Sequence, residues 1–200
     1  MTPNGSFNPV VAVARVMRGY RHPWFVSGGW AIDLFVGRVT RDHEDIEIGV
    51  FLPNQDALRR HLAGWELARI RNDAAEPWAA GDPIELPEFQ LQARSARRAP
   101  NVFDIFFNPL DGDEWVSRRH RGMRRPAAEI EARTAAHGRV PANVPFLVPE
   151  VQLLYKAKYH RPKDDADFEA AVGSMTAAQR RWLRETLARH HPGDAWIDSL

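Results

Sequence analysis

Apolar residues along the first half of the chain change their spacing several times. Residues 8–20 (NPVVAVARVMRGY) have helical spacing, with Asn8 as the expected cap and Pro9 in the first turn. Later runs alternate or are continuously apolar, which is typical of strands, and short helical runs lie between them. The predicted strands are residues 24–26, 45–51, 65–71, 88–94 and 101–108, and the predicted helices are residues 30–36 and 53–61.

Turn-forming and basic residues interrupt the apolar runs in the middle of the chain. Residues 72–87 carry three Pro and one Gly, and we expect them to be irregular. Asp111 and Gly112 predict a turn, after which residues 114–116 complete a hairpin. Residues 118–125 contain five Arg, and the ordinary interpretation of such a run is a solvated connection.

The last third of the chain is mainly helical. Residues 130–134 fit either a strand or a helix, and residues 144–148 predict a short strand. The predicted helices are residues 149–160, 163–172 and 176–189, with Thr176 as the cap of the last one. We therefore predict two parts, a mixed α/β core in residues 1–125 and a mainly helical part in residues 126–200 that packs on it.

Residues 25–51 combine features that suit a bound phosphate and a divalent cation. Ser27-Gly28-Gly29 is a small-residue turn at the start of a predicted helix, where backbone N–H groups attract anions. Asp45 and Glu47 lie two residues apart on the next predicted strand, so their carboxylates point to the same face. Such oxygens are ligands of Mg²⁺, although an exposed strand edge also commonly carries acids.

Asp104 is a third acid, inside the continuous apolar run of residues 101–108 (NVFDIFFN). A buried ionised carboxylate is costly unless it is paired, for example with an Arg, or bound to a metal. Three acids that converge from neighbouring strands repel one another, and bound Mg²⁺ removes that repulsion. Together with the glycine turn, the pattern favours ions that hold a triphosphate and stabilise the attacking and leaving oxygens.

Lysine is rare in this chain and is clustered. Of the 27 Lys and Arg residues only Lys156, Lys158 and Lys163 are lysines, so 24 are arginines. A compact ammonium group suits a phosphate, whereas chance and a solvated helix face explain the cluster about equally well. Residues 156 and 158 of a helix lie about 200° apart, so we expect only one of them to face a site.

Composition and charge narrow the class of protein further. The formal net charge is only +1, which gives no bulk attraction to nucleic acid or to a membrane surface. The sequence has no apolar run of spanning length and no signal-peptide pattern. The absence of Cys excludes disulfides and thiolate ligands. We therefore expect a cytoplasmic protein that binds neither nucleic acid nor membranes, and its oligomeric state stays open.

Two runs resemble a known group of enzymes. SGGWAIDLFVGRVTRDHEDIEI is similar to the opening motif of small bacterial nucleotidyltransferases of the DNA polymerase β superfamily, in the branch of the aminoglycoside and lincosamide nucleotidyltransferases. VPEVQLLYKAKYHRPKDDADF resembles the Lys-bearing helical segment of the same branch. The resemblance is specific over residues 24–51 and 145–168 and looser over residues 102–107. It implies an α+β fold, with a nucleotidyltransferase-like mixed sheet flanked by helices and followed by a C-terminal helical segment.

The resemblance also implies roles for single residues. Glu47 stands where many members have Asp, and its extra methylene would shift a bound ion slightly. Arg41 fits either a phosphate contact or a structural salt bridge. The implied catalytic and metal-binding residues are Asp45, Glu47 and Asp104, and the implied nucleotide-binding residues are Ser27, Gly28, Gly29, Arg41, Lys156 and Lys158.

The leading hypothesis is an enzyme with a two-ion Mg²⁺ site. It would transfer a nucleoside monophosphate from an NTP, in the first place ATP, to a hydroxyl of a small-molecule acceptor and release pyrophosphate. An aminoglycoside-like antibiotic is one such acceptor, but a polycation requires an acidic pocket. The alternatives are a non-catalytic or regulatory nucleotide-binding protein, and a nucleotidyltransferase that acts on a protein partner, as in toxin–antitoxin-like pairs.

Overall fold

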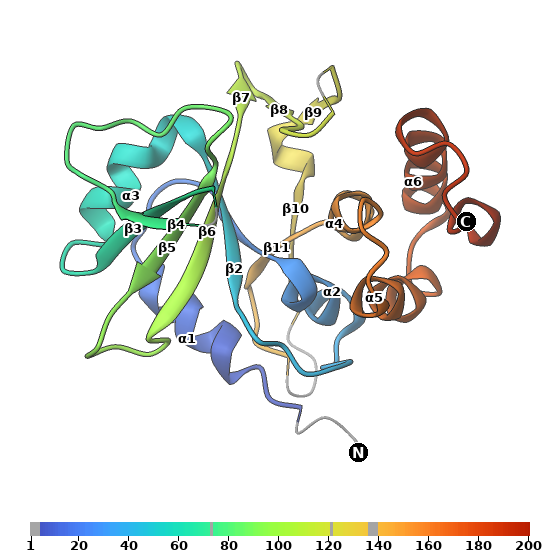
Figure 1. The fold of residues 1–200 in the computed structure, drawn as a ribbon. Coiled ribbons are helices and arrows are strands. Elements are labelled where there is room, and N and C mark those ends of the chain that lie inside the picture. Colours follow the sequence, from blue (N-terminus) through green and yellow to red (C-terminus); the bar gives the residue numbers. More distant parts are fainter. Residues whose placement is uncertain (1–4, 73, 121, 136–139) are drawn as a thin grey trace.

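The computed structural model describes residues 5–72, 74–120, 122–135 and 140–200. Its centre is an eight-stranded mixed sheet with the strand order β10-β11-β1-β2-β6-β5-β3-β4 (Figure 1). These strands are β1 (Trp24–Ser27), β2 (Glu47–Phe51), β3 (Glu66–Arg71), β4 (Ala74–Pro77), β5 (Gln90–Arg94), β6 (Val102–Asn108), β10 (Glu131–Arg133) and β11 (Pro145–Leu147). A separate three-stranded sheet consists of β7 (Leu110–Asp111), β8 (Glu114–Val116) and β9 (Arg124–Pro126).

The central pair of strands, β2 and β6, sorts apolar and polar side chains onto opposite faces. The two strands run parallel, and Glu47 is in register with Asp104. Ile48, Val50, Ile105 and Phe107 are fully buried on one face. Because side chains alternate along a strand, the other face of the same strands carries Glu47 and Gly49 on β2 and Asp104, Phe106 and Asn108 on β6. This second face is the floor of the candidate site.

Helices cover both faces of the large sheet. Figure 1 shows α1 (Asn8–Val16) and α3 (Gln55–His61) on one side, and α2 (Gly28–Val36) with α4 (Pro149–Lys156), α5 (Pro162–Val172) and α6 (Ala177–His190) on the other. The ring of His61 contacts the carbonyl of Val16 at 2.9 Å, which joins α3 to the end of α1. Short 3-10 turns lie at Leu52–Asn54, Ala127–Glu129 and Ile197–Ser199.

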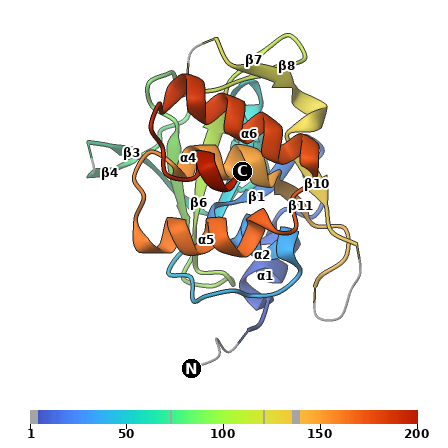
Figure 2. The same ribbon diagram turned by 90° about the vertical axis from the view of Figure 1, so that its right-hand side faces the viewer.

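The C-terminal helices have a hydrophobic cluster of their own. Ile32 of α2 packs there with Leu153 of α4, Phe168 of α5 and Leu183 of α6. Figure 2 shows α4, α5 and α6 lying in front of the sheet strands. The helices therefore pack on the site face of the sheet through α2, which is the element that begins at the glycine turn.

Within the described residues, no helix is both long and apolar enough to cross a membrane.

The predicted α+β fold is confirmed, with differences in single elements. Asn8 is the first residue of α1 rather than its cap, and α1 ends at Val16. Thr176 does cap α6, and its hydroxyl accepts the N–H of Gln179 at 3.2 Å. Residues 74–77 form a strand where an irregular segment was expected. The segment expected as a solvated connection contains β9.

The two-part division at residue 125 stays a prediction. The strands β10 and β11 lie beyond that boundary, yet β11 pairs with β1 in the large sheet through Val26 and Phe146. Residues 126–200 therefore supply the helices α4, α5 and α6 as well as two strands of the large sheet.

Candidate active site

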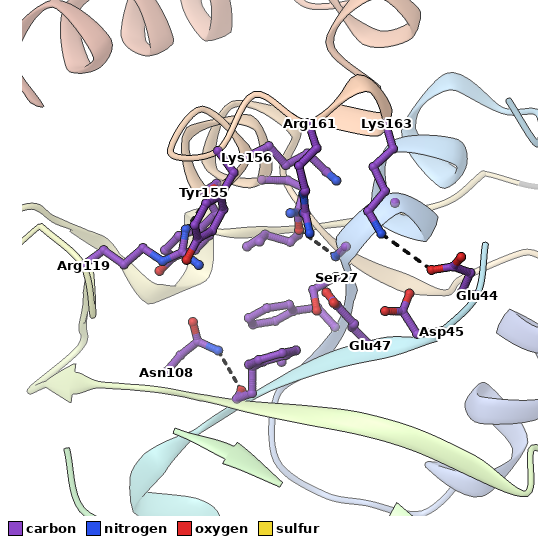
Figure 3. A pocket seen from close by; sticks show the side chains of 18 of the residues that line it. Ser27, Glu44, Asp45, Glu47, Asn108, Arg119, Tyr155, Lys156, Arg161 and Lys163 are labelled. Atoms are coloured by element: carbon purple, nitrogen blue, oxygen red, sulfur yellow. Dashed lines mark hydrogen bonds and ion pairs between the residues drawn. The ribbon is translucent and has the colours of Figure 1, made fainter. Parts of the chain in front are cut away.

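A pocket of about 350 Å³ lies between the polar face of the large sheet and the helices α2 and α4. Its floor comes from alternate residues of three strands: Ser27 of β1, Glu47 and Gly49 of β2, and Phe106 and Asn108 of β6. Figure 3 shows Asp45 and Glu44 towards one end of this pocket, Tyr155 and Arg119 towards the other, and Ser27 between them. The pocket thus has a carboxylate end and an aromatic, arginine-lined end.

The glycine turn brings the start of α2 against the carboxylate of Glu47. Gly28 has φ +69°, which favours glycine, and a Cβ there would lie 2.5 Å from Glu47 Oε2. Its N–H donates to Gln152 Oε1 at 2.8 Å, so this donor is already used. A Cβ on Gly29 would meet the side chains of Arg41 and His43. Both predicted glycines line the pocket, and a Cβ at either position would displace the pocket side chains that now approach the backbone.

Asp45 and Glu47 lie together at the pocket, although only Glu47 is in the strand. β2 begins at Glu47, so Asp45 stands in the preceding loop, where its carbonyl accepts the indole N–H of Trp30 at 3.0 Å. Burial, followed by repulsion from Asp45, raises the pKa of Glu47 to about 7. A cation beside these two groups would favour their ionised forms.

Asp104 extends from the strand beside Glu47 but does not line the pocket. It accepts a hydrogen bond from Gln92 Nε2 at 3.2 Å. Burial raises its pKa and Asp45 adds to that, against the hydrogen bond from Gln92. Among the residues that the structure describes, no group of three or more His, Asp or Glu is arranged to hold a metal ion.

The donor set nevertheless fits Mg²⁺ through Asp45 and Glu47. Magnesium in phosphoryl-transfer sites is usually held by one or two carboxylates, with water and substrate phosphates completing its shell. Two neighbouring acids, one of them with a raised pKa, meet that requirement without a third protein ligand. The two-ion site and the participation of Asp104 stay predictions.

Buried Asp33 fixes the loop that carries Asp45. Its carboxylate accepts the N–H of Thr40 at 3.0 Å and the Thr40 hydroxyl at 2.5 Å, and it contacts the ring of His43 at 2.5 Å. The His43 ring in turn lies 4.3 Å from the ring of Trp30. These contacts anchor the loop to α2, so His43 is a connector and the two carboxylates are held at the pocket.

Lys156 lines the pocket but is not a free ammonium group. It is buried, and its Nζ lies 2.7 Å from Asp167 Oδ2 and 3.1 Å from Asp164 Oδ1. Burial alone raises the pKa of Asp167, but the hydrogen bond from Arg41 and the attraction of Lys156 outweigh it and lower that pKa below its ordinary value. Lys158 is exposed, faces the ring of Tyr159 at 4.9 Å and does not line the pocket.

Arg41 combines the two roles that the sequence left open. Its guanidinium forms a two-pronged ion pair with Asp167, at 2.8 Å from Nε and 2.9 Å from Nη2, and it also lines the pocket. Arg161 pairs with Asp164 at 2.7 Å in the same way. Lys163, treated above as one of the clustered lysines, lines the pocket and lies 3.9 Å from Glu44.

The aromatic end of the pocket was not predicted from the sequence. Arg118 and Arg119 belong to the run that was expected to be a solvated connection, yet both line the pocket with Tyr155 and Asn108. Trp115, fully buried, donates its indole N–H to Asn108 Oδ1 at 3.1 Å. The one local signal was the position of the arginine pair directly after a strand that contains a buried Trp.

Comparisons with known proteins concern the fold and one segment of the chain. Residues 9–71 match the family model of aminoglycoside-2''-adenylyltransferase. No curated protein sequence matches the chain significantly. The lincosamide antibiotic adenylyltransferase LnuA, solved with lincomycin bound, is 14% identical with a TM-score of 0.58, over 86% of this chain and 100% of that one.

The antibiotic-resistance factor ANT(2'')-Ia is similar to the same extent. Its crystal structure with adenylyl-2''-tobramycin is 17% identical with a TM-score of 0.60, over 91% of this chain and 96% of that one. Its solution structure is 16% identical with a TM-score of 0.59, over 92% and 91% of the two chains. At these identities the structures establish the fold. The predicted resemblance is confirmed: the chain has the fold of the aminoglycoside and lincosamide nucleotidyltransferases, and its segment with the glycine turn and the paired acids matches the aminoglycoside-2''-adenylyltransferase model.

Proposed function

We propose that the chain is a Mg²⁺-dependent nucleotidyltransferase. It transfers a nucleoside monophosphate from an NTP, in the first place ATP, to a hydroxyl of a small-molecule acceptor. The observation that carries this proposal is the pair Asp45 and Glu47 beside the start of α2, in a pocket of a chain with the nucleotidyltransferase fold. The segment that holds these residues is also the one that matches an adenylyltransferase family model.

Asp45 and Glu47 are the residues that would hold Mg²⁺. When bound, the ion neutralises phosphate charge and stabilises the attacking and leaving oxygens. The raised pKa of Glu47 supports this role, since a carboxylate next to another acid gains from a nearby cation. Lys156 and Arg41 add positive charge to the same pocket. Both form ion pairs with Asp167, which hold them in fixed positions.

The reaction forms one bond and breaks one bond at the α-phosphorus. The acceptor oxygen attacks this phosphorus, the bond to the bridging oxygen of the β-phosphate breaks, and pyrophosphate leaves with that oxygen. The acceptor proton goes to a carboxylate, and we assign Asp104 as this general base because it neighbours Glu47 in register and its pKa is raised. Asp104 must approach the pocket for this role.

Pyrophosphate release tests the proposal. The purified chain is incubated with ATP and Mg²⁺ in the presence of a panel of hydroxyl-bearing antibiotics, and pyrophosphate is measured together with the mass of each acceptor. We expect an acceptor to gain one nucleoside monophosphate, and Asp45→Asn to abolish the gain. As a matched control, Asp42→Asn removes a nearby exposed carboxylate of the pocket and leaves the paired acids intact.

Two other outcomes of this experiment would favour one of the two alternative functions. If the unchanged chain and Asp45→Asn bind ATP equally and both are inert, the chain is a nucleotide-binding protein without this catalytic site. If labelled ATP modifies a protein partner and none of the small molecules, the acceptor is a protein side chain. Parallel assays with GTP, CTP and UTP determine the nucleobase preference.

A further inference from the structure

Arg118 lies at the pocket and forms no ion pair with a carboxylate of the described residues, although the charge of Glu47 acts on it at longer range. Its Cζ lies 4.4 Å from the ring of Phe89 and 4.9 Å from the rings of both Phe106 and Tyr155. Within the described part of the chain, its Nε and Nη1 atoms are buried and have no hydrogen-bond partner. Burial lowers the pKa of Arg118, which reflects the cost of keeping this charge out of water. Three aromatic rings therefore surround a guanidinium of which Nε and Nη1 are unused, and the Tyr155 hydroxyl is near enough to favour its charged form.

Two buried hydroxyl groups of the same pocket are also without a partner. Ser27 and Tyr155 are each only 7% exposed, and neither Ser27 Oγ nor the Tyr155 hydroxyl hydrogen-bonds to any described residue. Buried polar groups in folded proteins are nearly always hydrogen-bonded, because an unmade bond leaves the cost of removing the group from water uncompensated. Seven described side chains have such an atom, and three of them, Ser27, Arg118 and Tyr155, line this one pocket, so a single ligand would account for all three together.

The chemistry of these groups specifies the ligand. A guanidinium can only donate hydrogen bonds, and hydroxyl groups can also donate. The missing partner therefore accepts hydrogen bonds, and the charge of Arg118 favours an anion. An arginine fork matches the paired oxygens of phosphate or carboxylate.

Four of the other pocket cations have a carboxylate partner, and one of them, Lys163, lies 3.9 Å from Glu44. Arg41, Lys156 and Arg161 pair with Asp164 or Asp167. Arg119 donates to the carbonyl of Tyr155 at 2.6 Å, so it braces α4. Arg118 and Arg119 are thus the pocket cations for which no ion pair is found among the described residues.

We propose that Arg118, Tyr155 and Ser27 form an oxyanion subsite that binds a phosphate or carboxylate group of a substrate. This proposal deepens the proposed function and rests on it for the identity of the substrates. The oxyanion has two sources, the polyphosphate of the nucleotide or an anionic group of the acceptor. In the second case Arg118 repels ammonium groups, so the acceptor is an anionic or uncharged hydroxyl compound and not a polycationic aminoglycoside.

Binding of pyrophosphate in EDTA tests the subsite. Without divalent cations Asp45 and Glu47 repel the ligand, so binding depends on the side chains of the protein. Calorimetric titration should show that Arg118→Met weakens binding about tenfold to 100-fold, because a charged hydrogen-bonding group is lost. Tyr155→Phe should weaken it several-fold. Arg97→Met, which removes an exposed Arg outside the pocket, should leave it unchanged.

A second arm assigns the source of the oxyanion. Inorganic phosphate is titrated into the chain with and without saturating α,β-methylene ATP. Loss of phosphate binding in the nucleotide complex assigns the subsite to the polyphosphate, whereas retained binding assigns it to the acceptor. In both cases Arg118→Met must abolish the phosphate signal.

The subsite is overturned if the unchanged chain binds neither pyrophosphate nor phosphate at millimolar concentrations. It is also overturned if Arg118→Met binds them as well as the unchanged chain does. Arg118→Lys serves as the second variant should Arg118→Met fail to fold: it keeps the charge, loses the fork and should bind with intermediate affinity. These titrations contain neither Mg²⁺ nor acceptor, so their failure is distinct from an absence of nucleotidyl transfer.

Discussion

Two pairs of carboxylates near the pocket have opposite environments. Asp164 and Asp167 are fully buried and paired with Arg41, Lys156 and Arg161 at 2.7–3.1 Å. Asp45 and Glu47 have no ion-pair partner within the described residues, and burial together with Asp45 raises the pKa of Glu47. The pKa values of Asp164 and Asp167 are lowered instead.

The difference separates a structural network from a functional site. Asp164 and Asp167 receive their counter-charges from the protein, so they stabilise the fold and hold Lys156 and Arg41 in place. Asp45 and Glu47 form no such ion pair among the described residues, and the attraction of Lys156 and Arg118 does not outweigh the effect of burial and Asp45 on the pKa of Glu47. Perturbed groups of this kind are typical of functional sites, where a bound ligand can supply the counter-charge. The predictions below change one member of either pair.

The largest expected effect follows the loss of one member of the metal-binding pair. Asp45→Asn should lower the rate of nucleotidyl transfer on the order of 1,000-fold or more, because the several kcal/mol supplied by a bound ion depend on this ligand. The melting temperature should stay within a few degrees of that of the unchanged chain, since Asp45 is exposed and its carbonyl contact with Trp30 remains. Rate and melting temperature are measured on the same preparation.

Asp167→Asn should act on stability instead. It leaves Lys156 and Arg41 partly unpaired in the interior, which should lower the free energy of unfolding by about 3 kcal/mol or more. Asp111→Asn, which removes a largely exposed partner of Arg124, should change it by less than about 1 kcal/mol. Urea unfolding at pH 7 measures both. Equal small effects of the two variants would contradict the structural role of Asp167.

The same network predicts a dependence of stability on pH. The pKa of Asp167 in the folded chain is lower than its ordinary value of 3.8, so its contribution is present above about pH 4. The contribution is lost as the pH falls further. The difference in unfolding free energy between the unchanged chain and Asp167→Asn should therefore shrink in the acid range.

Glu47→Gln should stabilise the metal-free chain. Folding raises the pKa of Glu47 from 4.5 to about 7, so ionised Glu47 opposes folding above pH 4.5 and does so fully above pH 7. In EDTA at pH 8 the variant should gain about 3 kcal/mol of unfolding free energy, and at pH 4 it should gain nothing. A loss of stability at pH 8 would show that Glu47 is compensated by the protein. Thermal unfolding at the two pH values measures the difference.

The smallest effect concerns the lysine that does not line the pocket. Lys158→Ala should change the free energy of unfolding by no more than about 0.5 kcal/mol, because the side chain is exposed and makes no ion pair among the described residues. The affinity for ATP should stay within about twofold. Lys156→Ala, in contrast, should weaken both. Equal losses in the two variants would contradict the assignment of the pocket-facing lysine.

Local sequence patterns predicted the elements around the site well. The run of residues 25–51 combines a strand, a glycine turn, a helix and a second strand, and each has a signal within a few residues. The sequence pattern placed Asp104 on a separate apolar strand, whereas the parallel register that brings it beside Glu47 is an observation of the structure.

Other features depend on contacts between distant segments. Residues 74–77 (AAEP) have little strand propensity and are a strand only because β3 offers an edge to pair with. The run of arginines at 118–125 is typical of a solvated loop, and nothing local shows that Phe89, Phe106 and Tyr155 gather around Arg118. The pairing of Lys156 with Asp167 likewise joins two helices that the sequence presents separately.

Calorimetric titration of α,β-methylene ATP with and without Mg²⁺ tests the central claim most directly. The claim is that a cation carried with the nucleotide compensates Asp45 and Glu47, which form no ion pair among the described residues. We predict that Mg²⁺ strengthens nucleotide binding at least tenfold in the unchanged chain and has little effect in Asp45→Asn. Equal affinities with and without Mg²⁺ in the unchanged chain, or the same response to Mg²⁺ in both proteins, would contradict this account.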